Sequence, residues 1–168
     1  MYFDSHAHYD DERFDDDRNE LLASFHDEGI ENVVNSSSDI ASSKASVALT
    51  EKYPFFYASV GVHPHEVEKM TEQDLLELET LSKHEKVVAI GEIGLDFYYD
   101  LSPRDMQRYW FKRQLELAER LDMPIIVHSR DAAQECFDII KASGVRKGVI
   151  HCYSGSAEDA VWLVEQGL

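Results

Sequence analysis

The chain has 168 residues, of which 43% are hydrophobic, and a formal net charge of −17. This length suits one domain with a real core, and its longest apolar runs fall far below the roughly 20 residues that a membrane helix requires. The acidity disfavours general coating of nucleic acid, which depends on Lys and Arg, although divalent cations held by carboxylates can invert the local field for a phosphate substrate. No segment resembles a secretion signal, and two cysteines suit reduced thiols, so we expect a cytoplasmic protein that contacts no membrane.

The first segment, MYFDSHAHYD, predicts a strand around residues 2–6. Successive side chains of a strand point to opposite faces, so Asp4, His6 and His8 project from the same side. Taken alone, this pattern fits a metal site and a merely polar solvent face equally well. The acidic stretch at 10–20 that follows is most simply a solvated loop and the start of a helix.

Further along the chain, strand-like apolar runs alternate with stretches of helical spacing. The runs lie at 31–36, 55–62, 86–93, 123–129 and 147–154. Between them, apolar residues recur at intervals of three and four, as at Leu75, Leu78 and Leu81, and Ser156 before an apolar run predicts a capped helix start. Six β/α units in this order predict a parallel sheet, because right-handed crossovers place helices over the strands.

Six of the eight histidines and one glutamate lie at or just beyond the ends of these predicted strands. They are His6, His8, His63, His65, Glu92, His128 and His151. The carboxyl ends of parallel strands gather at one face of a sheet, so we expect these side chains to converge. Imidazole and carboxylate are ligands that Zn²⁺, Mn²⁺, Ni²⁺ or Fe²⁺ select. Their convergence favours the metal site over the polar face.

Five segments together resemble the strand-end motifs of TatD-type metal-dependent deoxyribonucleases of the amidohydrolase superfamily: DSHAHYD, GVHPHE, AIGEIGLDFYYD, IIVHSRDA and GVIHCYSGS. The resemblance implies an α/β fold of the TIM-barrel type, and hydrolysis that typically removes nucleotides from the 3′ end of DNA. It also implies two divalent metal ions, with Mg, Mn, Zn and Ni as candidates. His6 and His8 would bind one ion, His128 and His151 the other, and Glu92 would be shared.

The resemblance is incomplete at its end. Such enzymes also share a late Asp after the eighth strand, which binds metal and transfers a proton, whereas this chain ends after the sixth predicted helix. A complete barrel typically runs about 250 residues. Asp100 and Asp131 cannot be assigned that role, and Asp96 suits orienting a ligand or its loop better than binding metal. We therefore expect residues 1–168 to form one partial barrel that lacks the last two β/α units, is weakly active at best, and self-associates through its open edges.

Four residues within these motifs carry two interpretations each. His63 is either a proton donor or phosphate contact, or a histidine buried behind the metals. Arg130 is either a bidentate phosphate donor or the ion-pair partner of an acid. Tyr98 and Tyr99 either stack on a base or pack within their loop. His65 is a weaker candidate for substrate binding, because it can face solvent.

Three classes of function follow. The favoured one is a deoxyribonuclease that cleaves phosphodiester bonds of DNA with metal-activated water, in which Glu92 and His63 take part in catalysis and Arg130 and His65 bind the substrate. The second is a metal-dependent hydrolase of small ester, amide or phosphate substrates, since a fold does not fix its substrate. The third is a non-catalytic, metal-binding barrel fragment that assembles with another chain.

Overall fold

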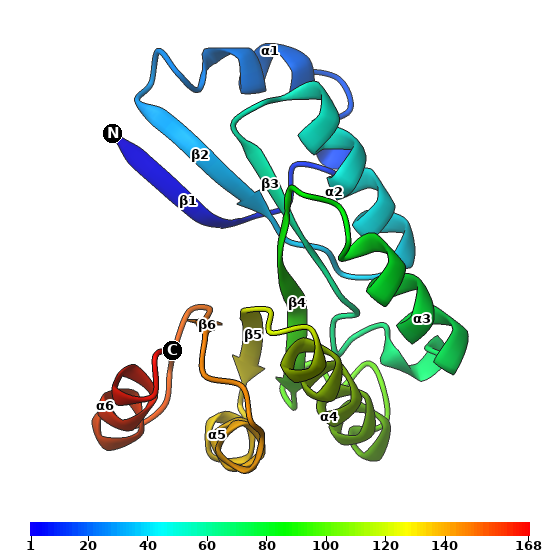
Figure 1. Ribbon diagram of the computed structural model, residues 1–168, viewed down its shortest axis with the longest axis vertical. Helices are drawn as coiled ribbons and strands as arrows, with labels where there is room; N and C mark the ends of the chain where they lie inside the picture. Colours follow the sequence, from blue (N-terminus) through cyan, green and yellow to red (C-terminus); the bar gives the residue numbers. More distant parts are fainter.

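The computed structural model describes residues 1–168 and contains one sheet of six parallel strands, in the spatial order β1-β2-β3-β4-β5-β6. Each strand pairs in parallel with its neighbour in the sequence. The predicted α/β class is confirmed, because the sheet curves into a half-barrel with β1 and β6 as its edges (Figure 1). The strands are β1 Tyr2–Ala7, β2 Ile30–Asn35, β3 Phe56–Val60, β4 Val87–Asp96, β5 Ile125–Arg130 and β6 Gly148–Ile150.

A helix follows every strand. The helices are α1 Arg18–Ser24, α2 Ile40–Lys52, α3 Glu72–Leu81, α4 Arg104–Arg120, α5 Ala133–Ala142 and α6 Ala157–Glu165, and 3-10 turns occupy Glu12–Phe14 and Val67–Lys69. The predicted cap of the last helix is confirmed, because Ser156 Oγ accepts a hydrogen bond of 3.0 Å from the amide of Asp159. None of the helices combines the length and the apolar content that a membrane crossing needs.

Three strand boundaries differ from the predictions. Strand β4 continues to Asp96, which pairs with Arg130 of β5, so Glu92 lies inside the strand and Asp96 belongs to the strand instead of a loop. Strand β6 has only 3 residues, because a turn begins at His151 and the next residue takes a left-handed φ of 49°. Strand β3 stops at Val60, which leaves His63 beyond its end.

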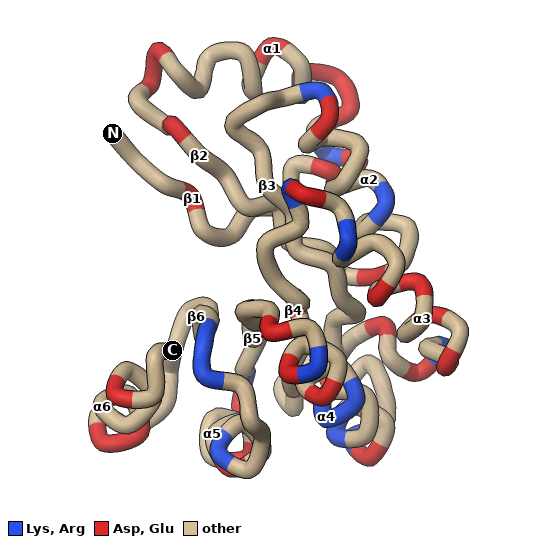
Figure 2. Tube along the Cα trace, in the orientation of Figure 1, with Lys and Arg blue, Asp and Glu red and all other residues tan.

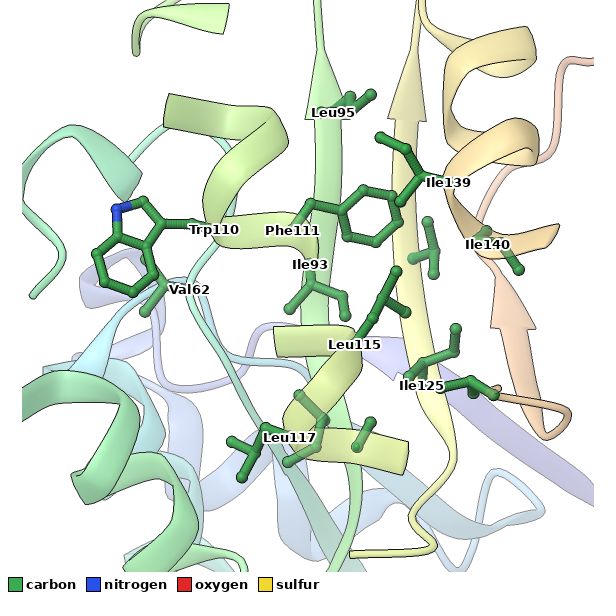
Figure 3. Packing of buried hydrophobic residues seen from close by; sticks show 14 of the residues in the cluster. Val62, Ile93, Leu95, Trp110, Phe111, Leu115, Leu117, Ile125, Ile139 and Ile140 are labelled. Atoms are coloured by element: carbon green, nitrogen blue, oxygen red, sulfur yellow. The ribbon is translucent and has the colours of Figure 1, made fainter. Parts of the chain in front are cut away.

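The main core lies between the sheet and α4. Phe111 of α4 is 1% exposed, and it packs towards the fully buried Ile93 and Leu95 of β4. Figure 3 shows this packing, and it shows Trp110 beside Val62, which lies just beyond the end of β3. Burying a large apolar side chain stabilises a fold by about 1.5–3 kcal/mol, so these contacts hold β4 firmly under the helix.

Two buried glutamines of α4 connect the helix to strand ends that carry site residues. The amide of Gln114 bonds both the backbone N–H and the carbonyl of Val62, at 2.8 and 3.0 Å. Gln107 likewise bonds the N–H and the carbonyl of Asp96, at 2.9 and 3.2 Å. Leaving such buried groups unpaired costs about 1–3 kcal/mol each. The helix therefore fixes where the chain before His63 and the end of β4 lie.

The close approach of β4 and β5 requires a glycine at position 94. Gly94 has a φ of 142°, and a Cβ atom there would lie 1.9 Å from the carbonyl oxygen of His128. Only glycine adopts this backbone conformation without strain. Because Gly94 pairs with His128, its missing side chain lets His128 approach Glu92.

Candidate metal centre

Glu92 lies at the centre of the converging side chains, and its two carboxylate oxygens face different histidines. Oε2 lies 3.3 Å from Nε2 of His6 and 3.6 Å from Nε2 of His8. Oε1 lies 3.0 Å from Nδ1 of His128 and 4.0 Å from Nε2 of His63. We call the first group, with Oε2, the β1 half-site, and the second group, with Oε1, the β5 half-site.

The Glu92 carboxylate carries a buried negative charge. The residue is 3% exposed. Burial opposes ionisation, but the rings of His128, His6 and His63 around the carboxylate outweigh it and hold the pKa of Glu92 far below its usual range. The ionised carboxylate therefore attracts cations to both of its oxygens.

In the β1 half-site, one buried residue of the neighbouring strand end orients both rings. Nδ1 of His8 lies 2.8 Å from the carbonyl oxygen of Ser36, which can only accept a hydrogen bond. The proton of the neutral ring therefore lies on Nδ1, and the Nε2 lone pair points into the site. Nδ1 of His6 lies 3.2 Å from the hydroxyl oxygen of the same Ser36, which can hold that ring in the same tautomer.

The spacing of these atoms fits a divalent cation. The Nε2 atoms of His6 and His8 lie 3.0 Å apart, and Oε2 of Glu92 lies 3.3 and 3.6 Å from them. Ligands bound at 2.0–2.1 Å in tetrahedral or octahedral geometry lie about 3.0–3.4 Å apart. Two nitrogen lone pairs and a carboxylate oxygen at these distances can hold zinc or another first-row metal, and the spacing does not select among them.

His151 lies against the β1 half-site. Its ring stacks on that of His6, with centroids 3.6 Å apart and planes 11° from parallel. One ring nitrogen of His151 lies within 4.8 Å of ligand atoms of His6 and Glu92. Burial, and then the neighbouring His6, lower the pKa of His151, which favours its neutral form. Its assignment to an ion shared with His128 stays a prediction.

In the β5 half-site, Asp96 decides which nitrogen of His128 faces Glu92. Oδ2 of Asp96 lies 3.0 Å from Nε2 of His128, and a carboxylate only accepts, so Nε2 carries a proton. Nδ1 then faces Oε1 of Glu92 at 3.0 Å. Burial opposes a charged ring, but Glu92 and Asp96 outweigh it and raise the pKa of His128. The gap between Nδ1 and Oε1 is thus a place for a cation, either a proton or a metal ion.

Asp96 also organises the loop that follows β4. Its side chain is fully buried, at 0% exposure. Oδ1 accepts hydrogen bonds from the amides of Tyr98 and Tyr99 at 3.0 and 2.8 Å, and Oδ2 accepts a second bond of 2.7 Å from Nε2 of His65. Burial opposes ionisation, but these bonds outweigh it and lower the pKa of Asp96. This arrangement agrees with the predicted orienting role.

Ring nitrogens of His63, His65 and His128 also lie within 4.8 Å of one another. The positions of their protons, however, disfavour a metal ion among these three rings. The amide of His65 donates to Nδ1 of His63 at 3.2 Å, so the His63 proton lies on Nε2. Asp96 fixes the Nε2 protons of the other two rings. In these tautomers Nε2 of each of the three rings is a hydrogen-bond donor, whereas a metal ion needs lone pairs.

His63 is neutral at ordinary pH. Its residue is 8% exposed, and burial lowers its pKa to about 3. A neutral ring with its proton on Nε2 can donate a hydrogen bond to a substrate oxygen, but it does not supply the charged imidazolium that a strong proton donor needs. The geometry thus favours the phosphate-contact interpretation of His63, and its role stays a prediction.

Two cavities open beside Glu92, and His8, His63 and His65 line both of them. Figure 2 shows acidic residues gathered around α1 and the segment before it, and this segment borders the first cavity, of about 850 Å³. The second cavity, of about 610 Å³, lies on the β5 side. The first is also lined by Asp10, Asp11, Glu12, Arg13, Asp39 and Glu66, and the second by Asp96, Tyr99, Ser129, Arg130, Asp131 and Cys152.

Arg130, on the second cavity, has no acidic partner. Arg146 donates to backbone carbonyls, and the other arginines form ion pairs: Arg13, Arg18, Arg104, Arg108, Arg113 and Arg120. The guanidinium of Arg130 lies over the rings of Tyr98 and Tyr99, 4.5 and 4.9 Å from their centroids. The structure thus gives Arg130 no ion pair, which leaves its guanidinium available to an anionic ligand, and its role in binding stays a prediction.

Sequence reasoning missed Ser36 and Gln107. A signal for Ser36 exists in the run of three serines that directly follows strand β2, at the same edge of the sheet as the histidines. Gln107 has no such signal, because its partner Asp96 lies in another element and only the packing of α4 on β4 brings them together.

Comparison with known proteins agrees with this geometry. The sequence model of the family described as TatD related DNase matches residues 3–168. The chain belongs to the TatD-related DNase family. It is 42% identical over 162 residues to the uncharacterized metal-dependent hydrolase YabD of Bacillus subtilis, a match that covers 95% of this chain and 64% of YabD. It is 30% identical to the 3′-5′ ssDNA/RNA exonuclease TatD of Cronobacter sakazakii, over 99% of this chain and 64% of that protein.

Solved structures of TatD-family proteins share the fold. The crystal structure of YjjV, a TatD homologue from Escherichia coli, superposes with a TM-score of 0.90 at 32% identity. The match covers 98% of this chain and 65% of YjjV. The six β/α units therefore correspond to just under two thirds of the length of these TatD relatives.

Proposed function

We propose that this chain is the metal-binding part of a deoxyribonuclease that removes nucleotides from the 3′ end of DNA. Two divalent ions would be held on either side of Glu92, by His6 and His8 in the β1 half-site and by His128 and His151 on the other side. Mg, Mn, Zn and Ni are the candidate metals. Membership of the TatD-related DNase family and the convergence of these side chains on one ionised carboxylate support the proposal.

The ions, when bound, would supply the positive charge that activates water for attack on phosphorus and neutralises the phosphate oxygens. Glu92 lies between the half-sites, so its Oε2 can serve the β1 half-site and its Oε1 the β5 half-site. His63 can donate its Nε2 proton in a hydrogen bond to a phosphate oxygen, because Nδ1 already accepts from the chain. His65, held by Asp96 at 2.7 Å, remains the weaker candidate for substrate contact.

The unpaired guanidinium of Arg130 is the observation that most favours an anionic substrate. In a chain with a net charge of −17, a free guanidinium is unusual, and Arg130 lies on the same cavity as Glu92 and His128. A guanidinium without a carboxylate partner can bind a phosphate through two parallel hydrogen bonds. The Cronobacter relative is described as acting on single-stranded DNA and RNA, which supports a nucleic-acid substrate.

The test is an assay of the protein in its full natural length, with Mn²⁺ or Mg²⁺ and single-stranded DNA labelled at its 5′ end. We expect products that shorten one nucleotide at a time from the 3′ end. Arg130→Gln should lower kcat/KM about tenfold to a hundredfold, because it removes charged hydrogen bonds to phosphate. Arg146→Gln, which alters an arginine bonded only to backbone carbonyls, is the matched control. Shortening from the 5′ end, or equal rates for both variants, would contradict the proposal.

A second candidate is a hydrolase of small ester, amide or phosphate substrates. The acidic cavity beside Asp10, Asp11 and Glu12 favours it, because these carboxylates repel a polyanion and accept a small neutral or cationic molecule. Faster hydrolysis of a p-nitrophenyl ester or anilide than of DNA, unaffected by Arg130→Gln, would support this candidate.

The non-catalytic alternative remains open to experiment as well. Metal binding without turnover of any of these substrates would indicate it. The edges of the half-barrel, β1 and β6, can pair with another chain. The mass of the 168-residue form in solution would show such self-association.

A further inference from the structure

Two adjacent tyrosines stand in solvent next to the metal centre. Tyr98 is 58% exposed and Tyr99 is 52% exposed, in the loop that follows β4. Loop packing, the alternative interpretation, would bury their rings. Neighbouring aromatic rings left in water commonly mark a binding surface.

The tyrosine loop is fixed to the site by a charged group. The amides of Tyr98 and Tyr99 both donate to Oδ1 of Asp96, whose Oδ2 holds His128 and His65. The same carboxylate thus sets the positions of the β5 half-site and of the two rings. The tyrosines are therefore held in a defined place relative to Glu92, as a binding site requires.

Arg130 completes a surface that suits a nucleotide. Its guanidinium lies over both rings, at 4.5 and 4.9 Å, and the two rings meet edge to face with centroids 4.9 Å apart. Its N–H groups bond no carboxylate and no other acceptor of the chain. Exposed aromatic rings stack on bases, and a guanidinium binds phosphate or stacks on a base itself.

The position of this surface selects one side of the site for the substrate. Tyr99 and Arg130 line the same cavity as Glu92 and His128, and the ring of Tyr99 lies 5.5 Å from that of His65. Its volume of about 610 Å³ lies within the range of about 300–1,000 Å³ typical of small-ligand pockets. The other cavity is the more acidic one: besides Glu92 its lining has five carboxylates and one arginine, Arg13, whereas the cavity of Arg130 has two further carboxylates, Asp96 and Asp131. A polyanion is therefore repelled more strongly on that other side.

We propose that Tyr98, Tyr99 and Arg130 form a nucleotide subsite, in which an unpaired base next to the scissile phosphate stacks on the tyrosines while Arg130 holds a phosphate. This inference rests on the proposed function, and it adds the recognition of an unpaired base. The subsite would account for action on single strands, which the name of the Cronobacter relative describes, because a base within a duplex is not free to stack on protein.

The test compares single-stranded DNA with an intact 3′ end and the same DNA with an abasic residue at the last or next-to-last position. In the full-length wild type with Mn²⁺, we expect the abasic residue at one of these positions to lower kcat/KM about tenfold or more. Tyr98→Ala or Tyr99→Ala should lower it similarly on intact DNA, with little further loss on the abasic substrate. A merely structural role would lower the rates on all substrates equally.

Two further variants sharpen the test. Tyr98→Phe and Tyr99→Phe keep the rings and should keep the preference for a base. Tyr109→Ala is the matched control, because Tyr109 is 49% exposed beside an arginine, Arg113, whose charge Glu72 already neutralises. The subsite is overturned if the abasic residue does not lower kcat/KM of the wild type. It is also overturned if the abasic residue lowers kcat/KM of the Ala variants by the same factor as that of the wild type. If the wild type leaves intact DNA uncut, the proposed function fails and this inference fails with it.

Discussion

The two half-sites around Glu92 use the same residue type in different ways. In the β1 half-site, a backbone carbonyl and a hydroxyl of Ser36 hold the rings of His6 and His8, and the Nε2 atoms face inward. In the β5 half-site, a buried carboxylate, Asp96, holds Nε2 of His128, and Nδ1 faces inward. The hydrogen-bond partner behind each ring therefore decides which nitrogen can bind a metal.

The difference also concerns charge. Ser36 offers neutral groups, whereas Asp96 brings a second negative charge to within 3.0 Å of the His128 ring. A carboxylate behind an imidazole makes the ring a stronger base and a stronger ligand. We therefore expect metal binding by His128 to depend more on Asp96 than metal binding by His6 and His8 depends on Ser36.

Glu92→Gln should have the largest effect, because it removes the element that both half-sites share. A glutamine has one carbonyl oxygen, and its NH₂ group cannot bind a cation, so at least one half-site loses its carboxylate ligand. We expect metal-dependent hydrolysis to fall by more than about a thousandfold, with an unchanged circular dichroism spectrum. Glu85→Gln, at an exposed position, is the control. Activity within tenfold of the wild type would show that Glu92 serves only the fold.

Asp96→Asn should disable the β5 half-site alone. The amides of Tyr98 and Tyr99 require an oxygen, so the new NH₂ group turns towards His128. Nε2 must then accept, and the proton moves to Nδ1, where it blocks the nitrogen that faces Glu92. By calorimetric titration with Mn²⁺, we expect affinity at one of two sites to fall about tenfold to a hundredfold.

Asp131→Asn is the matched control for that variant. Asp131 lines the same cavity and has a φ of 53°, which asparagine also tolerates. Its titration should match that of the wild type. Equal losses at both metal positions in Asp96→Asn would contradict the separation into two half-sites.

Ser36→Ala should have the smallest effect. It removes the hydroxyl at 3.2 Å from His6, but the backbone carbonyl that holds His8 remains. We expect a loss of metal affinity of about tenfold or less, confined to the other site of the titration. Ser38→Ala, whose hydroxyl lies near Ser42 and no histidine, should leave both sites unchanged. A larger loss than that of Asp96→Asn would reverse the proposed ranking of the two half-sites.

The strands and the convergence of the histidines could be predicted from the sequence, because buried parallel strands are continuous apolar runs and their ends meet at one edge. Helix α2 was not recognised by its spacing. Its most buried positions are Ser43, Ser46 and Thr50, and its apolar residues Ile40 and Val47 are only partly buried against the core. Ser46 bonds the side chains of Asn35 and Ser37 at 2.8 and 3.0 Å, so this helix docks through hydrogen bonds that no hydrophobic period reveals.

The tautomers of the site histidines could not be predicted from the sequence either. Asp96 and His128 are 32 residues apart, and Ser36 and His8 are 28 residues apart. Nothing in the local pattern connects them, because the contacts depend on strand register and on the approach that Gly94 allows. The sequence could indicate which residues gather, but not which atom of each faces the metal.

The most direct test of the two half-sites is a crystal structure of the protein with Mn²⁺, with anomalous diffraction locating the ions. We expect two peaks on either side of the Glu92 carboxylate, one in contact with the Nε2 atoms of His6 and His8 and the other in contact with Nδ1 of His128. A single peak surrounded by His63, His65 and His128, or coordination of His128 through Nε2, would contradict this account.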